Sequence, residues 1–247
     1  MNPQKGEILC FNKPYTLTSF DVVARARGIL KRFIKQVDPT IKKLKVGHAG
    51  TLDPLATGVL LICTGKATKR IEELQAHTKE YVATLKIGAT TPSFDKETEE
   101  DATYPTEHIT RESLCAVLKS FVGEIQQVPP VFSAVKINGK RAYKFARQGE
   151  EVELKAKTLV IDEIELMNYE SSAEGISAVI RVVCSKGTYI RALARDIGQA
   201  LNSGAYLTDL IRTRVGEYRL SDCLDIADFE EWMSKQHIET EKTENES

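Results

Sequence analysis

Apolar residues recur along the chain with two spacings, which predict an alternation of strands and amphipathic helices. A helical period beginning after a Thr18–Asp21 capping box predicts a helix over about 19–37. Strict alternation from Tyr81 onward predicts a half-buried strand over 81–88. The apolar positions that recur in the helix are Phe20, Val23, Leu30, Phe33 and Val37, and those in the strand are Tyr81, Ala83, Leu85 and Ile87.

The same patterns place the remaining elements. Strands are expected over 7–11, 58–64, 158–169 and 176–184, with the last two joined as a hairpin, and helices over about 66–75, 110–122 and 189–201. The polar, acid-rich residues 90–105 are expected to form a surface loop, and the polar residues 235–247 a frayed tail. Without an internal repeat or a Pro-rich linker, the simplest architecture is one mixed α+β domain over residues 1–234.

A glycine-punctuated run over 47–58 carries the strongest chemical signal. Asp53 stands among small and apolar residues, Pro54 fixes the backbone directly after it, and an apolar stretch follows as a buried strand. A carboxylate in such a place is available for catalysis. From these residues alone, an Asx-type turn before proline remains the alternative.

This run resembles the nucleophile motif of the TruB-type tRNA pseudouridine synthases, and further blocks agree in the same order over about residues 6–226. Thr16, Pro92, Glu97 and Ile211 depart from the family's usual residues. The agreeing blocks are Asn12-Lys13-Pro14 with Thr18-Ser19, Gly65–Lys69, Lys79-Glu80-Tyr81, Val128–Lys136 with Gly139, Tyr143, Ala146 and Arg147, Cys184–Arg191, and Leu210–Arg214 with Gly216 and Tyr218.

The resemblance implies the pseudouridine synthase fold, α+β with a mostly antiparallel mixed sheet flanked by helices and a central active-site cleft. It implies isomerisation of the uridine at position 55 in the T loop of tRNA, without a cofactor. Asp53 is then the nucleophile or base, Arg191 the cation that holds it ionised, and Tyr81 the aromatic group stacked on the flipped base. Without the resemblance, Arg191 is equally a helix-surface arginine and Tyr81 a core or edge-strand tyrosine.

The resemblance also implies a set of substrate-binding residues. His48 is expected to help displace the target nucleotide, and Lys13 to support the pocket near Tyr81. Net charge is only −1, but basic residues are segregated along the chain, as phosphate contact requires. The residues expected to contact phosphates are Lys66, Lys69, Lys136, Lys140, Arg141 and Arg147; Lys42, Lys43, Lys45, Arg191, Arg195, Arg212 and Arg214 add to the same basic face. By itself, a solvated charged surface is the alternative.

Composition excludes several other classes. No apolar run approaches the roughly 18 residues of a membrane helix, so a cytoplasmic protein is expected. The five cysteines and four histidines are too scattered for a disulfide framework or a zinc site, so no metal is expected. Around Gly65-Lys66-Ala67 the P-loop pattern fails, because Leu60 replaces its first glycine and Ala67 its Ser or Thr.

Two functional alternatives remain. The chain could be a noncatalytic RNA-binding or RNA-folding protein of the same fold, although such a protein has no use for Asp53, Tyr81 and Arg191 together. It could also act on another RNA, as a guide-RNA subunit does. Only about 27 residues follow Leu220, fewer than the roughly 40 of an independent domain, so the small C-terminal RNA-binding domain of many relatives is expected to be absent. A monomer without an obligatory protein partner is expected.

Overall fold

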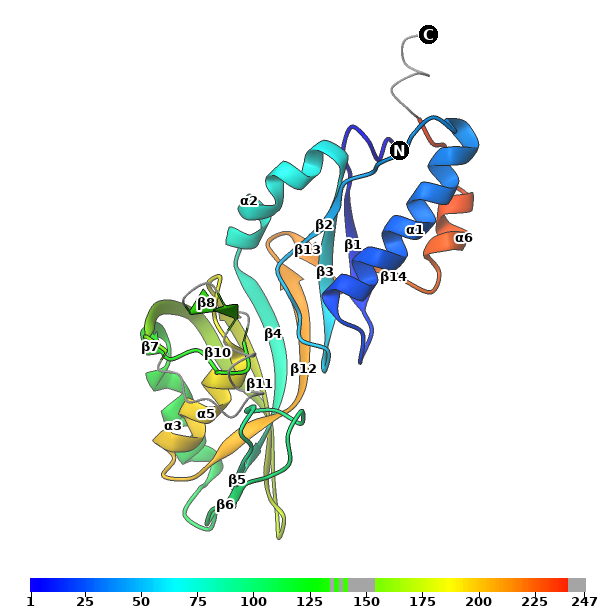
Figure 1. Ribbon diagram of the computed structural model, residues 1–247. Helices are drawn as coiled ribbons and strands as arrows, with labels where there is room; N and C mark the ends of the chain where they lie inside the picture. The colour runs from blue at the N-terminus through cyan, green and yellow to red at the C-terminus, as the bar shows by residue number, and fades with distance from the viewer. Residues whose placement is uncertain (134–135, 138–139, 142–153, 240–247) are drawn as a thin grey trace. The chain divides into compact units, whose positions relative to one another are not determined.

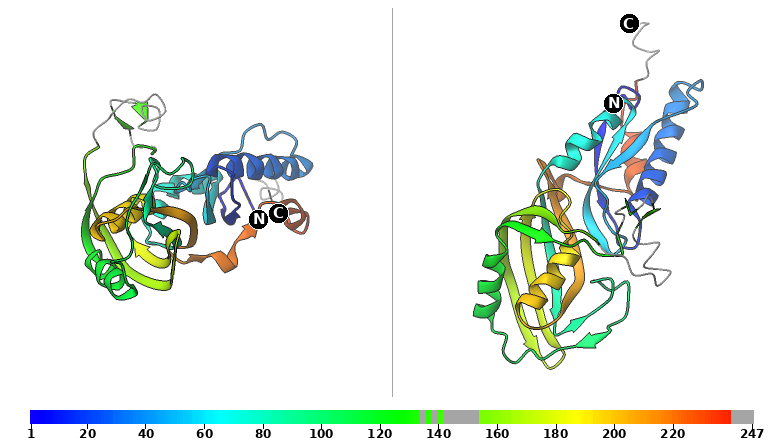
Figure 2. Two further views of the ribbon diagram at one scale, coloured as in Figure 1. Left: turned by 90° about the horizontal axis from the view of Figure 1, so that it is seen from below. Right: turned by 60° about the vertical axis from the view of Figure 1, so that its left-hand side comes forward.

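The computed structural model describes residues 1–133, 136–137, 140–141 and 154–239. Its internal contacts divide the chain into two compact units, of which the first is Met1–Lys79 with Ile211–Ser247 and the second is Glu80–Leu210. Among the described residues, no helix combines the length and the apolar character needed to cross a bilayer. In each unit, helices cover the strands, as Figures 1 and 2 show.

The first unit contains the strands β14-β1-β3-β12 in that order, with β2 paired to β3 and β13 paired to β12. β1 and β3 are antiparallel, and β1 and β14 are parallel. Its elements are β1 (Ile8–Lys13), α1 (Ser19–Val37), β2 (Val46–Ala49), β3 (Ala56–Thr64), η1 (Gly65–Arg70), α2 (Ile71–Ala76), the end of β12 (Ala205–Val215), β13 (Tyr218–Arg219), η2 (Leu220–Asp222), β14 (Leu224–Asp225) and α6 (Phe229–Ser234).

Alternation along β3 produces two cores in this unit. Leu60 and Ile62 pack with α1 and α6 on one face, while Val59 and Leu61 pack with Leu74 of α2 on the other. Figure 1 shows α1 and α6 side by side against β1. A strand buried on both faces reads as a continuous apolar run, which explains the sequence Val59–Cys63.

The second unit contains the strands β4-β11-β10-β7 in that order, with the start of β12 beside β4. Helices α3 and α5 pack against each other, and α3 packs on β10. Its elements are β4 (Lys79–Ile87), β5 (Ala89–Thr90), β6 (Ala102–Thr103), α3 (Arg111–Ser120), β7 (Gly123–Gln127), β8 (Lys136–Ile137), β9 (Lys140–Arg141), β10 (Lys157–Ser172), β11 (Gly175–Cys184) and α5 (Ile190–Ala200).

Several predicted elements are confirmed. Helix α1 spans Ser19–Val37, and its Thr18–Asp21 capping box is present. Strand β4 alternates between buried and half-buried residues from end to end, and β10 and β11 form the expected hairpin. The expected strands over 7–11 and 58–64 and the helices over 110–122 and 189–201 are found with small shifts at their ends.

Other predictions were wrong in detail. Phe20 and Val37 of α1 are 64% and 43% exposed, because the buried stripe of the helix runs through Val22, Ala26, Leu30 and Ile34 instead. The helix expected over 66–75 is a 3₁₀ turn followed by the short α2.

Two further segments differ from expectation. Residues 90–105 are not only a surface loop, since Thr91, Ser93 and Asp95 within them are buried. The part of the expected tail that the structure describes, up to Glu239, is hydrogen-bonded to the N-terminus. The Met1 ammonium donates to the His237 carbonyl at 2.6 Å, and the Glu239 amide donates to the Met1 carbonyl at 3.0 Å. Residues 240–247 lie outside the described part of the chain.

Candidate active site

The turn that carries Asp53 lies in the first unit, between β2 and β3. Its backbone closes on itself, because the Ala56 amide donates to the Asp53 carbonyl at 3.1 Å, with Pro54 in the second position of the turn. Asp53 itself is half-buried. The sequence therefore places a carboxylate on a short, closed turn just before a strand that is buried except at half-buried Thr57.

Side chains and backbone from outside the turn hold the residues on both sides of Asp53. The Ser19 hydroxyl of α1 bonds both backbone groups of Leu52, at 2.8 Å to its amide and 3.0 Å to its carbonyl. The Pro54 carbonyl accepts from the Lys13 ammonium at 3.2 Å and from the Thr16 amide at 2.9 Å. These bonds fix the backbone from which the carboxylate projects, as a preorganised nucleophile requires.

Among the described residues, Arg212 of β12 is the largest nearly fully buried side chain, with 1% exposure. Its guanidinium donates to three carbonyls, those of Val59 at 2.7 Å, Gly50 at 3.1 Å and Thr51 at 3.4 Å. These carbonyls lie on both sides of the Asp53 turn. A planar fork of five donors is suited to bridging them in this way.

Gly58, at the start of β3, lets the two chains come this close. Its φ is +103°, and a Cβ placed on it would lie 2.2 Å from the Arg212 carbonyl oxygen and 2.8 Å from the Arg212 amide nitrogen. No side chain fits at these distances. The glycine that closes the sequence motif is therefore required by the backbone of β12.

Thr16 shows how the departure from the family's usual residue is accommodated. Its φ is +71°, in the left-handed region that glycine adopts without strain. The conformation delivers the Thr16 amide to the Pro54 carbonyl. The first turn thus keeps a glycine-like shape with a β-branched residue, at a cost of about 1–3 kcal/mol in conformational energy.

Lys13 is completely buried, and its ammonium donates to the Leu17, Pro14 and Pro54 carbonyls at 2.6, 2.9 and 3.2 Å. Burial lowers the pKa of Lys13 to about 8, with Arg212 acting in the same direction, while the negative charge of Asp53 opposes the shift. The acid turn is therefore flanked by two buried cations, Lys13 and Arg212.

The lowered pKa of Lys13 predicts a specific dependence of stability on pH. Between about pH 8 and 10.5 the unfolded chain keeps the Lys13 proton and the folded chain releases it, so the free energy of unfolding rises with pH. For this group the rise is at most on the order of 3 kcal/mol. Urea titrations of the wild type and of Lys13→Met from pH 7 to 10.5 measure it. A constant difference between the two proteins over that range would contradict the assignment.

His48 lies in β2, where it pairs with Ile62, so its ring is on the α1 face of the sheet. Burial lowers the pKa of His48, and the charge of Arg212 adds to the effect. The Nδ1 atom is buried without a hydrogen-bond partner among the described residues. The ring is therefore neutral near pH 7 and suited to stacking.

Arg191 and Tyr81 lie in the second unit. Tyr81 is 8% exposed on the apolar face of β4, as its alternation predicted. Arg191 is in the first turn of α5 and is 5% exposed, so it is not part of a basic surface. Gln127, fully buried, positions this helix start by accepting from the Tyr189 amide at 2.9 Å and donating to its carbonyl at 3.2 Å.

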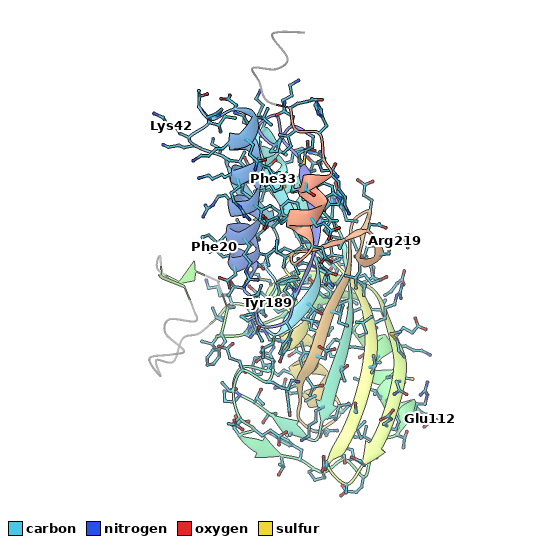
Figure 3. All side chains as sticks on the ribbon, turned by 90° about the vertical axis from the view of Figure 1, so that its right-hand side faces the viewer. Phe20, Phe33, Lys42, Glu112, Tyr189 and Arg219 are labelled. Carbon is cyan, nitrogen blue, oxygen red and sulfur yellow. The ribbon has the colours of Figure 1, made fainter. Side chains whose placement is uncertain are left out.

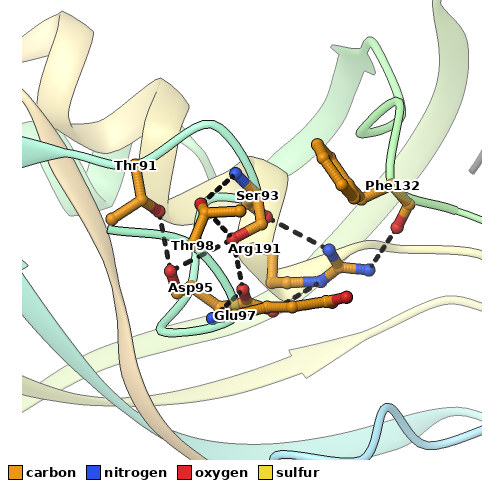
Figure 4. A network of polar contacts seen from close by, with 7 residues as sticks. All are labelled: Thr91, Ser93, Asp95, Glu97, Thr98, Phe132 and Arg191. Carbon is orange, nitrogen blue, oxygen red and sulfur yellow. Dashed lines mark hydrogen bonds and ion pairs between the residues drawn. The ribbon is translucent and has the colours of Figure 1, made fainter. Parts of the chain in front are cut away.

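Figure 4 shows the polar network around the Arg191 guanidinium. The guanidinium donates to the Phe132 carbonyl at 2.9 Å and to the Ser93 carbonyl at 3.1 Å, and its Nε lies 3.5 Å from the Asp95 carboxylate. Asp95 in turn accepts from the Ser93 hydroxyl at 2.6 Å and from the Glu97 amide at 2.9 Å. A buried acid within residues 90–105 thus orients the arginine, and a pairing of Arg191 with Asp53 stays a prediction.

The predicted phosphate contacts are placed unevenly. Lys66 and Lys69 are exposed on η1, at the opposite end of β3 from Asp53 and roughly 27 Å away along the strand. Lys136 pairs with Arg141 and Ile137 with Lys140 in the hairpin β8–β9. The side chains of Lys136, Lys140 and Arg141, and all of Arg147, lie outside the described part of the chain.

Sequence reasoning missed three residues that hold this chemistry, namely Ser19, Asp95 and Arg212. Arg212 was grouped with surface cations, yet a glycine at each end of the acid run already indicates a close approach by another chain. Ser19 stands in one of the blocks that resemble the family but was given no role, and Asp95 gave no signal. No group of three or more His, Cys, Asp or Glu suited to a metal ion occurs among the described residues.

Comparisons with known proteins identify the family. The family model described as TruB family pseudouridylate synthase (N terminal domain) matches residues 37–190. A second family model, described as tRNA pseudouridylate synthase B C-terminal domain, matches residues 191–244.

Individual relatives agree with this match. The chain is 66% identical over 239 residues to tRNA pseudouridine synthase B of Phocaeicola vulgatus, covering 97% of this chain and 98% of the relative. It is 50% identical over 234 residues to the protein of the same name from Flavobacterium johnsoniae, covering 94% and 99%.

A solved structure also matches, with a TM-score of 0.67 and 30% identity over 93% of this chain and 55% of the other. It is described as Crystal Structure of a Cbf5-Nop10-Gar1 Complex. The expected α+β pseudouridine synthase fold, a mixed sheet flanked by helices, is confirmed. The chain belongs to the TruB family of pseudouridylate synthases.

Proposed function

We propose that this chain converts the uridine at position 55 in the T loop of tRNA to pseudouridine, with Asp53 as its nucleophile or base. The observation that carries the proposal is the Asp53 turn, whose flanking residues are bonded by Ser19, Lys13 and Arg212. Holding a carboxylate in one geometry beside buried cations serves catalysis and is not needed for phosphate binding.

The reaction is an isomerisation in which the bond between ribose C1′ and N1 breaks and a bond between C1′ and C5 forms. The proton on C5 leaves and N1 gains one, so no atom or electron is exchanged with another reactant. Asp53 attacks the sugar or base covalently, or removes the ribose 2′ proton to give a glycal. Both routes use an ionised Asp53.

Tyr81 and Arg191 complete the proposed site. Tyr81 stacks on the extruded base and assists removal of the C5 proton, and Arg191 supplies a guanidinium held in place by Asp95. His48, as a neutral ring, fills the space that the target base leaves. A monomer that works without an obligatory protein partner is part of the proposal, and a cytoplasmic location stays a prediction.

tRNA is proposed as the substrate over a guide-directed RNA because of the relatives that match end to end. The relative from Phocaeicola vulgatus is named tRNA pseudouridine synthase B and is matched over 98% of its length. The chain spans only 55% of the matched protein in the Cbf5 complex.

Release of tritium from uridine C5 tests both the reaction and the position. An unmodified tRNA labelled at every uridine should lose one equivalent of tritium per molecule. A matched transcript with cytidine at position 55 should lose none. Equal release from both transcripts would refute the position, and tight binding without any release would instead favour a noncatalytic RNA-binding protein.

A further inference from the structure

The segment from the start of α1 to the start of β2 concentrates positive charge on a chain that is nearly neutral. Ser19–Lys45 contains eight Lys or Arg and two Asp, a net charge of +6, whereas the whole chain has a net charge of −1. Local potential, not net charge, attracts a polyanion. The basic residues are Arg25, Arg27, Lys31, Arg32, Lys35, Lys42, Lys43 and Lys45.

Little of this charge is neutralised within the protein. Arg32 pairs with Glu230 of α6 at 2.8 Å, and no other of the eight side chains has an ion pair or hydrogen bond among the described residues. The two acids are already engaged, since Asp21 caps α1 and Asp38 accepts from Thr40. Seven of the eight cations, of which Arg27 and Lys31 are half-buried and the others exposed, therefore form no ion pair or hydrogen bond in the described part of the chain.

Part of this charge forms a stripe along α1. Phe20, Arg27, Lys31 and Lys35 are spaced by seven, four and four residues, which places them along one side of a helix. Phe20 is 64% exposed at the first turn. Figure 3 shows Phe20 and Lys42 on the side of α1 that faces away from α6. We call these four residues the α1 stripe.

The α1 stripe begins beside the acid turn. Ser19, next to Phe20, bonds both backbone groups of Leu52, which directly precedes Asp53. From there α1 runs about 28 Å to Val37, and the basic residues Lys42, Lys43 and Lys45 follow. When the target nucleotide of an RNA reaches Asp53, the neighbouring part of the RNA therefore lies next to the exposed ring of Phe20 and then next to a row of cations.

We infer that the α1 stripe binds the phosphate backbone of the RNA stem that adjoins the target loop, with Phe20 in contact with the loop end of that stem. The inference rests on the proposed function and adds an RNA-binding surface to it. Paired RNA offers phosphates and 2′-hydroxyls, because its deep, narrow major groove does not admit side chains that would read the bases. Lys and Arg at intervals of about 6 Å along a helix suit such a backbone.

The test compares two triple variants that remove the same charge. Arg27→Gln/Lys31→Gln/Lys35→Gln removes the cations of the stripe, and Lys119→Gln/Lys155→Gln/Lys157→Gln removes three exposed lysines of the second unit. Binding of an isolated T-arm stem-loop and of whole tRNA is titrated at several salt concentrations. The stripe variant should bind both RNAs at least about tenfold more weakly, with a salt slope shallower by about 2–3, and the control should stay within about twofold of the parent.

The measurements with the isolated stem-loop decide what the stripe contacts. Unchanged affinity and salt slope of the stripe variant for the stem-loop would overturn the inference, and a loss seen only with whole tRNA would place the contact elsewhere on the RNA and overturn it too. An equal loss of affinity in both triple variants would show that net charge, and not the position of the stripe, causes the effect. Phe20→Ala should weaken stem-loop binding severalfold without altering the salt slope, because it carries no charge.

Failure here is separable from failure of the proposed function. Tritium release by the unaltered chain reports the isomerisation whatever α1 binds. If release occurs and the stripe variant binds the stem-loop normally, the surface is refuted and the isomerase remains. If the stripe variant loses affinity and the unaltered chain releases no tritium, the surface stands in a noncatalytic RNA-binding protein.

Discussion

Asp53→Asn is expected to reduce turnover by roughly 10⁴-fold or more while leaving the affinity for tRNA within about threefold of the parent. The amide has the shape of the carboxylate, and the bonds of the turn run through the backbone of Leu52, Pro54 and Ala56. The substitution therefore removes the nucleophile or base and keeps the turn. Single-turnover tritium release at saturating protein measures the loss.

Asp162→Asn, at an exposed position of β10, is the matched control and should behave as the parent. If Asp53→Asn kept more than a tenth of the turnover of the parent, the carboxylate would have no essential role. If it lost tRNA affinity to the same degree as activity, Asp53 would be a binding residue.

Arg212→Met is expected to have the second largest effect, on both stability and turnover. It leaves the Gly50, Thr51 and Val59 carbonyls without their donor, which lowers the free energy of unfolding by about 3 kcal/mol. Displacement of the acid turn by a fraction of an ångström should lower turnover by roughly 10²-fold per folded molecule, with KM little changed. Urea titrations and kinetics at a temperature where the variant is folded separate the two effects.

Two further variants sharpen this test. Arg214→Met, two residues along β12, removes a partly buried arginine that donates to the Gly216 carbonyl at 3.2 Å, outside the acid turn, and should leave turnover per folded molecule close to that of the parent. Arg212→Lys keeps the charge and loses the fork, so it should recover only part of the activity. If Arg212→Met lost stability but kept the turnover per folded molecule of the parent, Arg212 would have only a structural role.

Local signals in the sequence were sufficient for some parts of the fold. The Thr18–Asp21 pair marks the start of α1 because both capping bonds lie within four residues. The alternation from Tyr81 gives the orientation of β4, since a two-residue period leaves only one choice of buried face. Asp53 could be predicted for a similar reason, because adjacent glycine and proline residues encode its turn.

The rest depends on contacts between residues far apart in the sequence. Arg212 and Gly50 are separated by 162 positions, and Arg191 and Ser93 by 98. Nothing near Arg212 distinguishes a buried guanidinium from a solvated one, and nothing near Asp95 indicates that an arginine 96 positions later lies beside it. Phe20 was expected on the buried side of α1 because it is apolar. Apolar residues can nevertheless be exposed on a protein surface, as Phe20 is.

The close contact at Gly58 also limits how this turn can evolve. Any side chain there would press into the peptide groups of Arg212, so a change at position 58 cannot be relieved by a new rotamer and demands a shift of the whole of β12. In a library randomised from Gly50 to Gly58, functional clones should retain glycine at the last position. Exposed Thr51, whose side chain is not held by this contact, has room to drift.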